Sequence, residues 1–128
     1  METLTTKGIK VSVKVQYQSN QSRPVHNQYV FAYQIIIENK SPETVQLLRR
    51  HWHIFDSCGM RREVEGDGVI GKQPILRPGE SHRYTSWCPL FSGLGKMHGT
   101  YLMERQADQT QFEVGVPVFH MVAPSIMN

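Results

Sequence analysis

The residues best suited to chemistry lie in a glycine-rich segment, residues 65–74, which reads EGDGVIGKQP. Its three glycines have the spacing G-x-G-x-x-G and are Gly66, Gly68 and Gly71. Dinucleotide-binding proteins use this spacing between a strand and a helix, whose N-terminus holds the pyrophosphate. Because Pro74 and Pro78 follow closely, no helix of useful length can begin at the third glycine. The segment is therefore predicted to be a loop between strands.

This loop has two interpretations. In the first, successive backbone N–H groups hold the oxygens of pyrophosphate or a nucleotide, and nearby basic side chains add positive charge. The ligand-binding residues would then be Gly66, Gly68, Gly71, Lys72 and Arg77, with Arg62 as a further source of charge. In the second, the glycines only provide positive φ or a close approach between chains. Because Asp67 would repel phosphate, the second interpretation is favoured.

Histidines and a cysteine could supply metal ligands. His51 and His53 share one face of a predicted strand, and His82, His98 and Cys88 follow in later segments. Neither of the ligand spacings C-x-x-C and H-x-x-x-H occurs in the chain. We therefore interpret these histidines as ordinary polar strand positions, and we expect no metal site and no cofactor.

The same residue types could form a nucleophile and its base. The candidate nucleophiles are Ser86, Cys58 and Cys88, and the candidate bases are His82, His51 and His98. The chain has no nucleophile elbow and no local signature of an acid–base pair. No catalytic residues, and no enzymatic activity, are predicted.

Hydrophobic patterning places these residues on strands and turns, because no window shows a helical period. The expected strands are residues 9–17, 29–38, 45–55, 61–65, 82–87, 100–106 and 112–122. Residues 9–17 alternate, with Lys10, Lys14 and Gln16 toward water. Residues 29–38 are rich in β-branched and aromatic side chains, which favours a central strand.

Alternation and turn chemistry also make finer predictions. Along residues 45–55, strict alternation places Val45, Leu47, Arg49, His51, His53 and Phe55 on one face. The other face carries Trp52, which is expected in the core. The segment Arg77-Pro78-Gly79-Glu80 fits a type II turn, and residues 91–99 are predicted to be a glycine-punctuated loop. Pro117 indicates an edge or a bulge in the last strand.

Several short strands without alternating helices predict an all-β fold, an antiparallel β-sandwich. The length of 128 residues suits one domain, residues 1–128. No segment approaches the roughly 20 apolar residues of a membrane helix, so no membrane partner is expected. The N-terminus lacks the pattern of a signal peptide, and the two cysteines are expected to be free thiols, so a cytoplasmic location is predicted.

The net charge of +3 is a mild excess. Nucleic-acid-binding proteins usually gather positive charge on one surface. Here the densest groups are the pairs at 49–50 and 61–62, and Glu63 and Glu65 follow the second pair. Nucleic acid is therefore an unlikely partner.

Several ordered motifs resemble the bacterial ApaG family between about residues 29 and 122. They read YVFAY, VQLLRRHW, VEGDGVIGKQP, LRPGE, YTS, GKMHGTY and VPVF. The resemblance implies a sandwich of seven to eight strands, of the fibronectin III or immunoglobulin-like kind. It also implies a loose association with cobalt resistance, magnesium efflux and diadenosine tetraphosphate metabolism. Related domains in eukaryotic proteins look like protein-interaction modules, and the family has no established enzymatic chemistry.

Two functions from different classes follow. The first is a non-catalytic binding module that presents its loops, or a sheet edge, to a protein partner of unknown identity. The alternative is a sensor that binds pyrophosphate or a nucleotide at residues 66–71, with or without a divalent metal. A hydrolase acting on a phosphorylated substrate is a third, weaker hypothesis.

Overall fold

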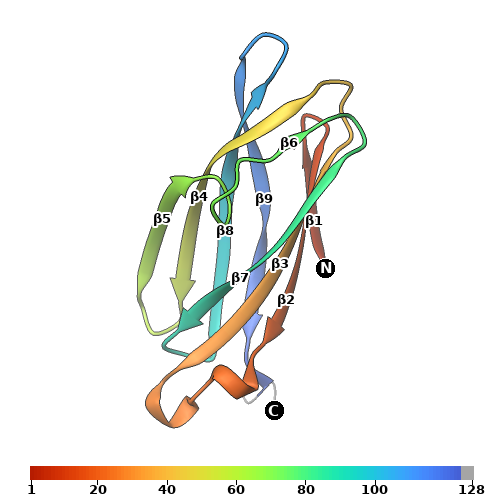
Figure 1. Cartoon of the computed structure of the whole chain (residues 1–128). Helices are drawn as coiled ribbons and strands as arrows, with labels where there is room; N and C mark the ends of the chain where they lie inside the picture. The colour runs from red at the N-terminus through yellow and green to blue at the C-terminus, as the bar shows by residue number, and fades with distance from the viewer. Residues whose placement is uncertain (125–128) are drawn as a thin grey trace.

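Two antiparallel β-sheets pack face to face in the computed structural model, which describes residues 1–124 (Figure 1). In the first sheet the order is β1 (Glu2–Thr6), β2 (Ile9–Tyr17), β3 (Tyr29–Asn39) and β7 (Ser81–Leu90). In the second it is β5 (Arg61–Asp67), β4 (Val45–Asp56), β8 (Leu94–Arg105) and β9 (Gln111–Val122). A short strand β6 (Ile75–Leu76) pairs with the start of β4. The predicted antiparallel β-sandwich is confirmed.

Residues 1–124 contain nine strands, against the seven to eight expected, because β1 and β6 lacked a sequence signal. Strand β1 forms a hairpin with β2 through a two-residue connection, Lys7 and Gly8, with φ of 49° and 82°. Both values suit a type I′ turn, but lysine is a poor marker of one. Two three-residue 3-10 turns, Ser19–Gln21 and Pro24–His26, lie between β2 and β3. Neither has the length needed to cross a bilayer.

The loop predicted over residues 91–99 is wrong beyond Gly93, because β8 begins at Leu94. Gly99 lies inside this strand, directly opposite Trp52 of β4. A Cβ atom at Gly99 would overlap the carbonyl oxygen of His51. Glycine at this position therefore permits a close approach of two strands rather than a turn.

Strand β4 contains a β-bulge that overturns the strict alternation predicted for it. The register with β8 shifts between Leu47 and Arg49, which leaves Leu48 as an extra residue. Before the bulge Val45 and Leu47 face the core, and after it Trp52 and Ile54 do. A bulge adds one residue to one strand and so exchanges the two faces beyond it.

A second bulge lies in β9, where the register shifts between Met97 and Gly99 of the partner strand β8. Phe119 pairs with Met97 and Val116 with Gly99, so Pro117 and Val118 together face a single residue. The proline, which has no N–H to donate, sits in the bulge of an edge strand. The prediction made for Pro117 is confirmed.

The core lies between the sheets, and its centre is aromatic. Trp52 makes edge-on contacts with Tyr33, Tyr101 and Phe119, at centroid distances of 5.6, 6.2 and 6.0 Å. All four side chains are buried, and Phe31 lies further along the face of β3 that carries Tyr33. The core position predicted for Trp52 is confirmed, at the place where immunoglobulin-like sandwiches bury a tryptophan.

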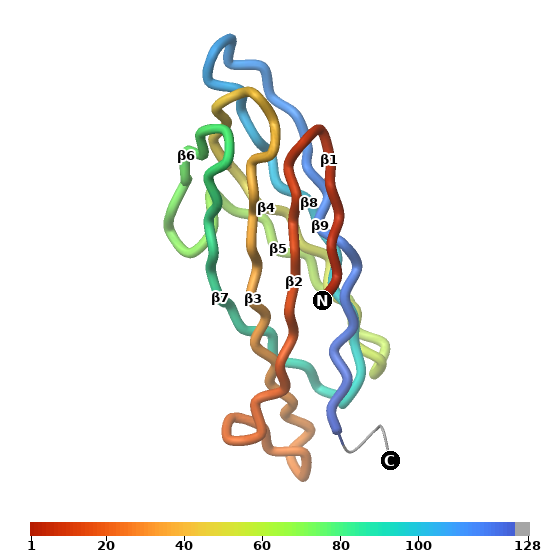
Figure 2. Tube along the Cα trace, turned by 90° about the vertical axis from the view of Figure 1, so that its right-hand side faces the viewer, coloured from red at the N-terminus to blue at the C-terminus, as the bar shows by residue number. Residues whose placement is uncertain are grey.

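The two sides of the sandwich differ. On one side β9 packs against β1 and β2, and the N–H of Gly115 donates to Thr6 Oγ1 at 3.2 Å. On the other side the edge strands β5 and β7 diverge, and the chain between β5 and β6 folds into the space between them (Figure 1). The trace in Figure 2 shows β7, β3, β2 and β1 in that order across the first sheet. The sandwich is thus closed at one side and open at the other.

Candidate functional site

The predicted glycine loop is anchored by the bulge of β4. The carbonyl of Leu48 accepts hydrogen bonds from the N–H of Gly68, at 2.8 Å, and from Gln73 Nε2, at 2.9 Å. Val69 and Lys72 exchange backbone hydrogen bonds of 2.8 and 3.0 Å. Three N–H groups of the loop, those of Gly68, Val69 and Lys72, therefore donate to carbonyl oxygens of the protein itself.

The glycines of this loop have distinct structural roles. Gly68 has a φ of +62°, and a Cβ atom there would overlap the carbonyl oxygen of Lys72. Gly71 has a φ of +71° with open space around it. At Gly66 a Cβ atom would lie 2.8 Å from Arg50 Nη1, so the absence of a side chain leaves room for the guanidinium of Arg50.

The predicted ligand-binding residues do not all come together. Gly66, Gly68, Gly71 and Lys72 share the loop, but Arg77 lies in the next turn. There the Arg77 guanidinium pairs with Glu80, at 3.6 Å from Nε to Oε1, and the Glu80 N–H donates to the Arg77 carbonyl at 2.9 Å. Burial, followed by the charge of Lys72, lowers the pKa of His82 on β7. The positive charge of Lys72 is therefore directed toward the edge of β7.

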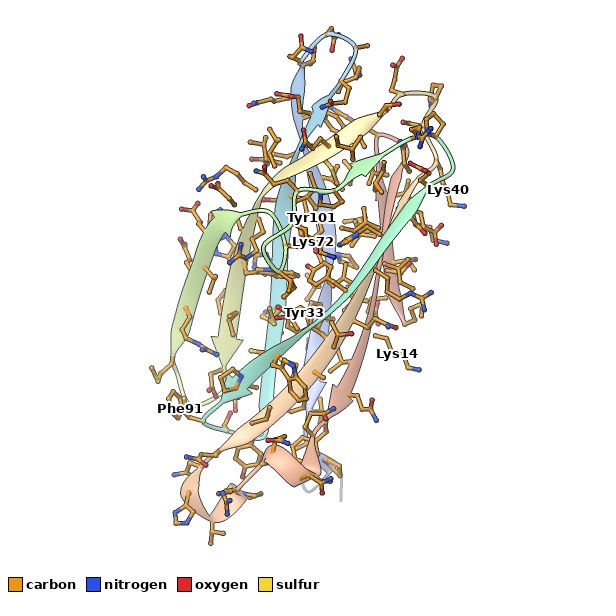
Figure 3. All side chains as sticks on the ribbon, viewed as in Figure 1. Lys14, Tyr33, Lys40, Lys72, Phe91 and Tyr101 are labelled. Atoms are coloured by element: carbon orange, nitrogen blue, oxygen red, sulfur yellow. The ribbon has the colours of Figure 1, made fainter. Side chains whose placement is uncertain are left out.

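A cavity of about 270 Å³ opens between β5 and β7, and we call it the inter-sheet cleft. Its polar lining consists of Arg50, Arg62, Tyr33, Tyr84 and Ser86. Its apolar lining includes Trp52, Val64, Val69, Ile70 and Trp87. Figure 3 shows Tyr33 and Tyr101 between the two sheets, with Lys72 on the nearby loop. The glycine loop therefore forms one wall of the cleft through Val69, Ile70 and Gly71.

Two arginines give the cleft its charge. Arg50 Nη1 donates to the carbonyls of Asp67 and Gly68, at 3.0 and 3.1 Å. Arg62 Nη2 reaches from β5 across to β7 and donates to the carbonyl of Pro89 at 2.5 Å. Within residues 1–124 neither guanidinium forms an ion pair with a carboxylate. Backbone carbonyls thus hold both groups in place while their charges stay unneutralised.

The remaining polar groups of the cleft are neutral. Burial raises the pKa of Tyr33 and of Tyr84, and it raises that of Tyr101 behind them. The hydroxyls of Tyr84 and Tyr101 share a hydrogen bond of 2.5 Å. Burial also raises the pKa of the Cys88 thiol to about 11, despite the nearby Arg62. The tyrosines are therefore protonated donors, and this thiol is not an activated nucleophile at neutral pH.

An exposed apolar residue stands at the mouth of the cleft. Ile70 is 60% exposed and has a φ of 48°, in the left-handed region. A β-branched residue rarely adopts this conformation, because its side chain crowds the backbone there. Such strain persists where the surroundings enforce it, and it concentrates at ligand-contacting positions.

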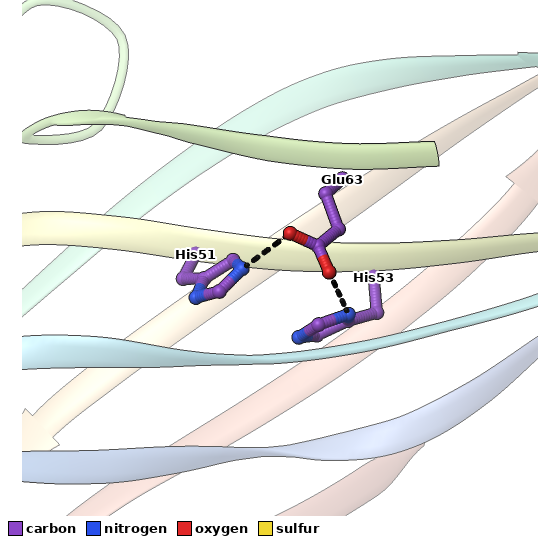
Figure 4. A group of neighbouring side chains, drawn as sticks. All are labelled: His51, His53 and Glu63. Carbon is purple, nitrogen blue, oxygen red and sulfur yellow. Dashed lines mark hydrogen bonds and ion pairs between the residues drawn. The ribbon is translucent and has the colours of Figure 1, made fainter. Parts of the chain in front are cut away.

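The histidines form a separate cluster on the outer face of the second sheet. His51 and His53 share this face as predicted, and Glu63 of β5 lies beside both (Figure 4). His98, expected in a loop, lies on β8 directly opposite His53. His82 and Cys88 lie on β7 of the other sheet. Burial, followed by His53 and Lys96, lowers the pKa of His98.

Sequence reasoning missed Arg50, Tyr33 and Tyr84 as site residues. They come from β4, β3 and β7, so only the packing of the two sheets brings them to one cleft. No spacing within the sequence reveals residues that come from three different strands. The bulge at Leu48 determines that Arg50 faces inward. Glu63 was missed for a similar reason, since its neighbours belong to an adjacent strand.

Comparisons with known proteins give one consistent family. The model of the ApaG domain matches residues 19–105. Protein ApaG of Paramagnetospirillum magneticum is 48% identical over 124 residues, which span 97% of this chain and 95% of that protein. Protein ApaG of Brucella abortus is 46% identical over the same shares. The crystal structure of an ApaA protein from Bordetella pertussis has a TM-score of 0.88 at 42% identity, covering 91% of this chain and 94% of that one.

Proposed function

This chain belongs to the ApaG family, and we propose that it is a non-catalytic binding module whose inter-sheet cleft takes an acidic segment of a partner protein. The observation that carries this proposal is the pair of guanidiniums, Arg50 and Arg62, which line the cleft without a carboxylate partner in the described chain. A charge held inside a half-enclosed cavity favours a ligand of opposite charge.

The chemistry of the lining supports a carboxylate ligand. A guanidinium presents a planar fork of N–H donors that matches a carboxylate, and such charge-assisted hydrogen bonds are strong. The protonated hydroxyls of Tyr33 and Tyr84 add neutral donors beside it. Val64 and Ile70 offer apolar contacts at the rim for the residues that flank the acidic side chain.

The edges of the cleft support an extended segment. Strand β7 is the last strand of the first sheet, and β5 is the last strand of the second. Each edge carries backbone groups without a neighbouring strand, which an added strand of another chain can pair with. A partner segment at this side would thus gain backbone hydrogen bonds and place alternate side chains in the cleft.

The lining also supports a non-catalytic role. Among the described residues that line the cleft there is no aspartate, glutamate or histidine. Acid–base catalysis relies on such groups, with a pKa near the working pH. The Cys88 thiol and the tyrosines are held protonated by burial. The cleft therefore offers binding groups without a base or an activated nucleophile.

A peptide-array selection tests this function. The labelled protein is applied to an array of random-sequence peptides, and the bound sequences are expected to be enriched in Asp or Glu next to apolar residues. Arg62→Gln should weaken the best peptide about ten- to a hundredfold, because a hydrogen bond to a charged group is lost. Arg83→Gln changes an exposed arginine on β7, the strand at the facing edge of the cleft, and this matched control should bind normally. Binding without acidic enrichment, or equal binding by both variants, would contradict the proposal.

A second candidate is the sensor for pyrophosphate or a nucleotide, with or without a divalent metal. Its support is that the same two guanidiniums suit phosphate oxygens, and that Lys72 lies on the adjoining loop. The glycine loop itself contributes fewer free N–H groups, since those of Gly68, Val69 and Lys72 are already bonded. The charge for an anion would thus come mainly from Arg50 and Arg62. The family's association with metal efflux, and the cytoplasmic location, stay predictions.

An amide NMR titration with pyrophosphate and then ATP, with and without Mg²⁺, decides on this candidate. Saturable shifts at residues 66–72 and around Arg50 and Arg62 would favour the sensor. The absence of shifts at millimolar ligand would remove it and leave the peptide-binding module. Loss of these shifts in Arg62→Gln, but not in Arg77→Gln, would place the anion in the cleft rather than at the neighbouring turn.

A further inference from the structure

The histidine cluster on the outer face of β4 is built like a metal site. His51 and His53 are alternate residues of β4, and their rings lie side by side with centroids 4.5 Å apart. Glu63 of β5 pairs with His53 in the register of the sheet. Its carboxylate lies 3.4 Å from His51 Nε2 through Oε2 and 3.4 Å from His53 Nδ1 through Oε1 (Figure 4). One carboxylate is thus shared between two imidazoles.

A second carboxylate fixes the first histidine. Glu65 Oε1 lies 3.1 Å from Nδ1 of His51, on the side of the ring away from Glu63. Glu65 is close enough to support the tautomer of His51 that carries its proton on Nδ1. In that tautomer the lone pair of Nε2 faces the carboxylate of Glu63, and a cation between these two acceptor groups can bind both. Metal-binding histidines commonly have this carboxylate support at the other nitrogen.

We propose that His51, His53 and Glu63 bind a divalent transition-metal ion, such as Zn²⁺, on the outer face of the second sheet. One ligand atom of each residue lies within 4.8 Å of the others, so a single ion can contact all three after small side-chain rotations. Glu65 acts as a positioning residue for His51. The site faces solvent, so water completes the coordination, as in zinc sites with three protein ligands.

The donor set selects the kind of ion. Two imidazole nitrogens and one carboxylate oxygen suit Zn²⁺, Ni²⁺, Co²⁺ and Cu²⁺. Mg²⁺ and Ca²⁺ prefer oxygen ligands, and Mg²⁺ holds its water firmly. The neighbouring positive charge of Arg49 is offset by its ion pair with Asp67, at 2.8 Å. We therefore expect Zn²⁺ to bind in the presence of excess Mg²⁺.

This site is independent of the inter-sheet cleft. On β4 the side chains of His51 and His53 face outward, whereas those of Arg50 and Trp52 face the cleft and the core. A ligand of the cleft and a metal ion at His51 would thus occupy opposite faces of one strand. The metal site can fail without consequence for the proposed function, and the reverse also holds.

A calorimetric titration of the tag-free full chain with Zn²⁺ tests the site. Wild-type protein should bind one ion per chain, and His53→Ala and Glu63→Gln should each weaken binding more than tenfold. Glu65→Gln should weaken it about tenfold, as expected for the loss of a supporting carboxylate. His26→Ala removes an exposed histidine in the 3-10 turn Pro24–His26 and should change nothing.

Two readouts keep the test decisive. Amide spectra of each variant show that its fold is retained, since the changed side chains lie at the surface or are half-buried. Imidazole ¹⁵N signals of His51 and His53 should shift together on addition of Zn²⁺, while the signal of His26 stays unchanged. The absence of saturable binding by the wild-type protein, or wild-type affinity in His53→Ala and Glu63→Gln, would overturn the proposal.

Discussion

Ile70 is the residue at which the backbone conformation costs stability while the side chain is exposed at the proposed binding site. Its backbone lies in the left-handed region although its side chain is β-branched and mostly exposed. Asparagine tolerates this conformation far better than isoleucine does. We expect Ile70→Asn to raise the free energy of unfolding by about 1 kcal/mol in urea denaturation and to weaken the selected peptide. A stabilised variant with unchanged peptide affinity would show that Ile70 is not part of the binding surface.

Alanine substitutions at two glycines of the loop distinguish the cost of a strained backbone from the cost of steric overlap. Both Gly68 and Gly71 have positive φ, but only Gly68 has the Lys72 carbonyl where a Cβ would lie. Gly71→Ala should cost about 1 kcal/mol of unfolding free energy, from the left-handed backbone alone. Gly68→Ala should cost clearly more, because the carbonyl group of Lys72 must also move away from the new Cβ atom. Equal decreases in unfolding free energy for the two variants, measured by chemical denaturation, would mean that the loop adjusts at Gly68 without a further cost.

Asp56 makes part of the stability depend on pH. Its carboxylate accepts hydrogen bonds from the Phe91 N–H, at 2.6 Å, from the Ser92 hydroxyl, at 2.5 Å, and from the Cys58 N–H, at 3.3 Å. Burial opposes ionisation, but these bonds outweigh it and lower the pKa of Asp56. A lowered folded-state pKa stabilises the protein above the unfolded value, about 3.9, and this stabilisation is lost as the pH falls through the folded value.

Replacement of this carboxylate makes that effect measurable. Asp56→Asn should lower the unfolding free energy at neutral pH by about 1–3 kcal/mol, because the N–H of Phe91 loses its charged, buried acceptor. The difference from wild type should shrink as the pH is lowered below about 4. Urea denaturation at several pH values gives both curves. A difference that is constant with pH would mean that the charge of Asp56 contributes nothing.

At the scale of elements, the two bulges decide which side chains reach the site. Alternation predicts the strands, but each bulge inserts one residue and exchanges the faces beyond it. In β4 the bulge at Leu48 turns Arg50 inward to the cleft and leaves His51 and His53 on the outer face. Its carbonyl also anchors the glycine loop through Gly68 and Gln73. The proline in β9 gave a signal for its bulge, whereas no residue type marked the bulge in β4.

Strand β5 is an element whose attachment can be tested. Among the strands of residues 1–124 it pairs with β4 alone, and Arg62 connects it to β7 through the carbonyl of Pro89. Arg62→Ala should therefore speed amide hydrogen exchange in β5 relative to β8, because local opening loses one restraint. Arg61→Ala is the matched control, since Arg61 is exposed and lies over the ring of Phe55 at 5.0 Å. Equal exchange in both variants would show that the contact to Pro89 does not restrain β5.

At the scale of the whole molecule, the sandwich could be predicted and the site could not. The period-two pattern of β2, the β-branched and aromatic residues of β3 and the turn at Arg77-Pro78-Gly79-Glu80 are local signals, and the structure confirms the elements that they predict. The cleft depends on how two sheets diverge, and its arginines lie on strands joined by a hairpin. The glycine motif drew attention to the correct region. Its N–H groups, however, mostly serve the loop itself, while side chains of the facing strands supply the charge.

The proposed function rests on the difference between the two sides of the sandwich. One side is closed by β9 against β1 and β2. The other leaves two strand edges and, beside an apolar rim, two guanidiniums that form no ion pair with a carboxylate of residues 1–124. The proposed function places the bound peptide at the open side, so the position of a bound peptide is the quantity to measure. A peptide bound at an outer face of the sheets, or at the loops at one end of the sandwich, would contradict this proposal.

The most direct test is an amide NMR titration of the ¹⁵N-labelled protein with the best acidic peptide from the array. Saturable shifts are expected along β5, residues 66–71 and β7, together with slowed exchange of amides on the two open edges. The same titration of Arg62→Gln should show those shifts only at much higher peptide concentration. Shifts confined to the outer faces of the sheets, or to the end of the sandwich at η1 and η2, would contradict the central claim.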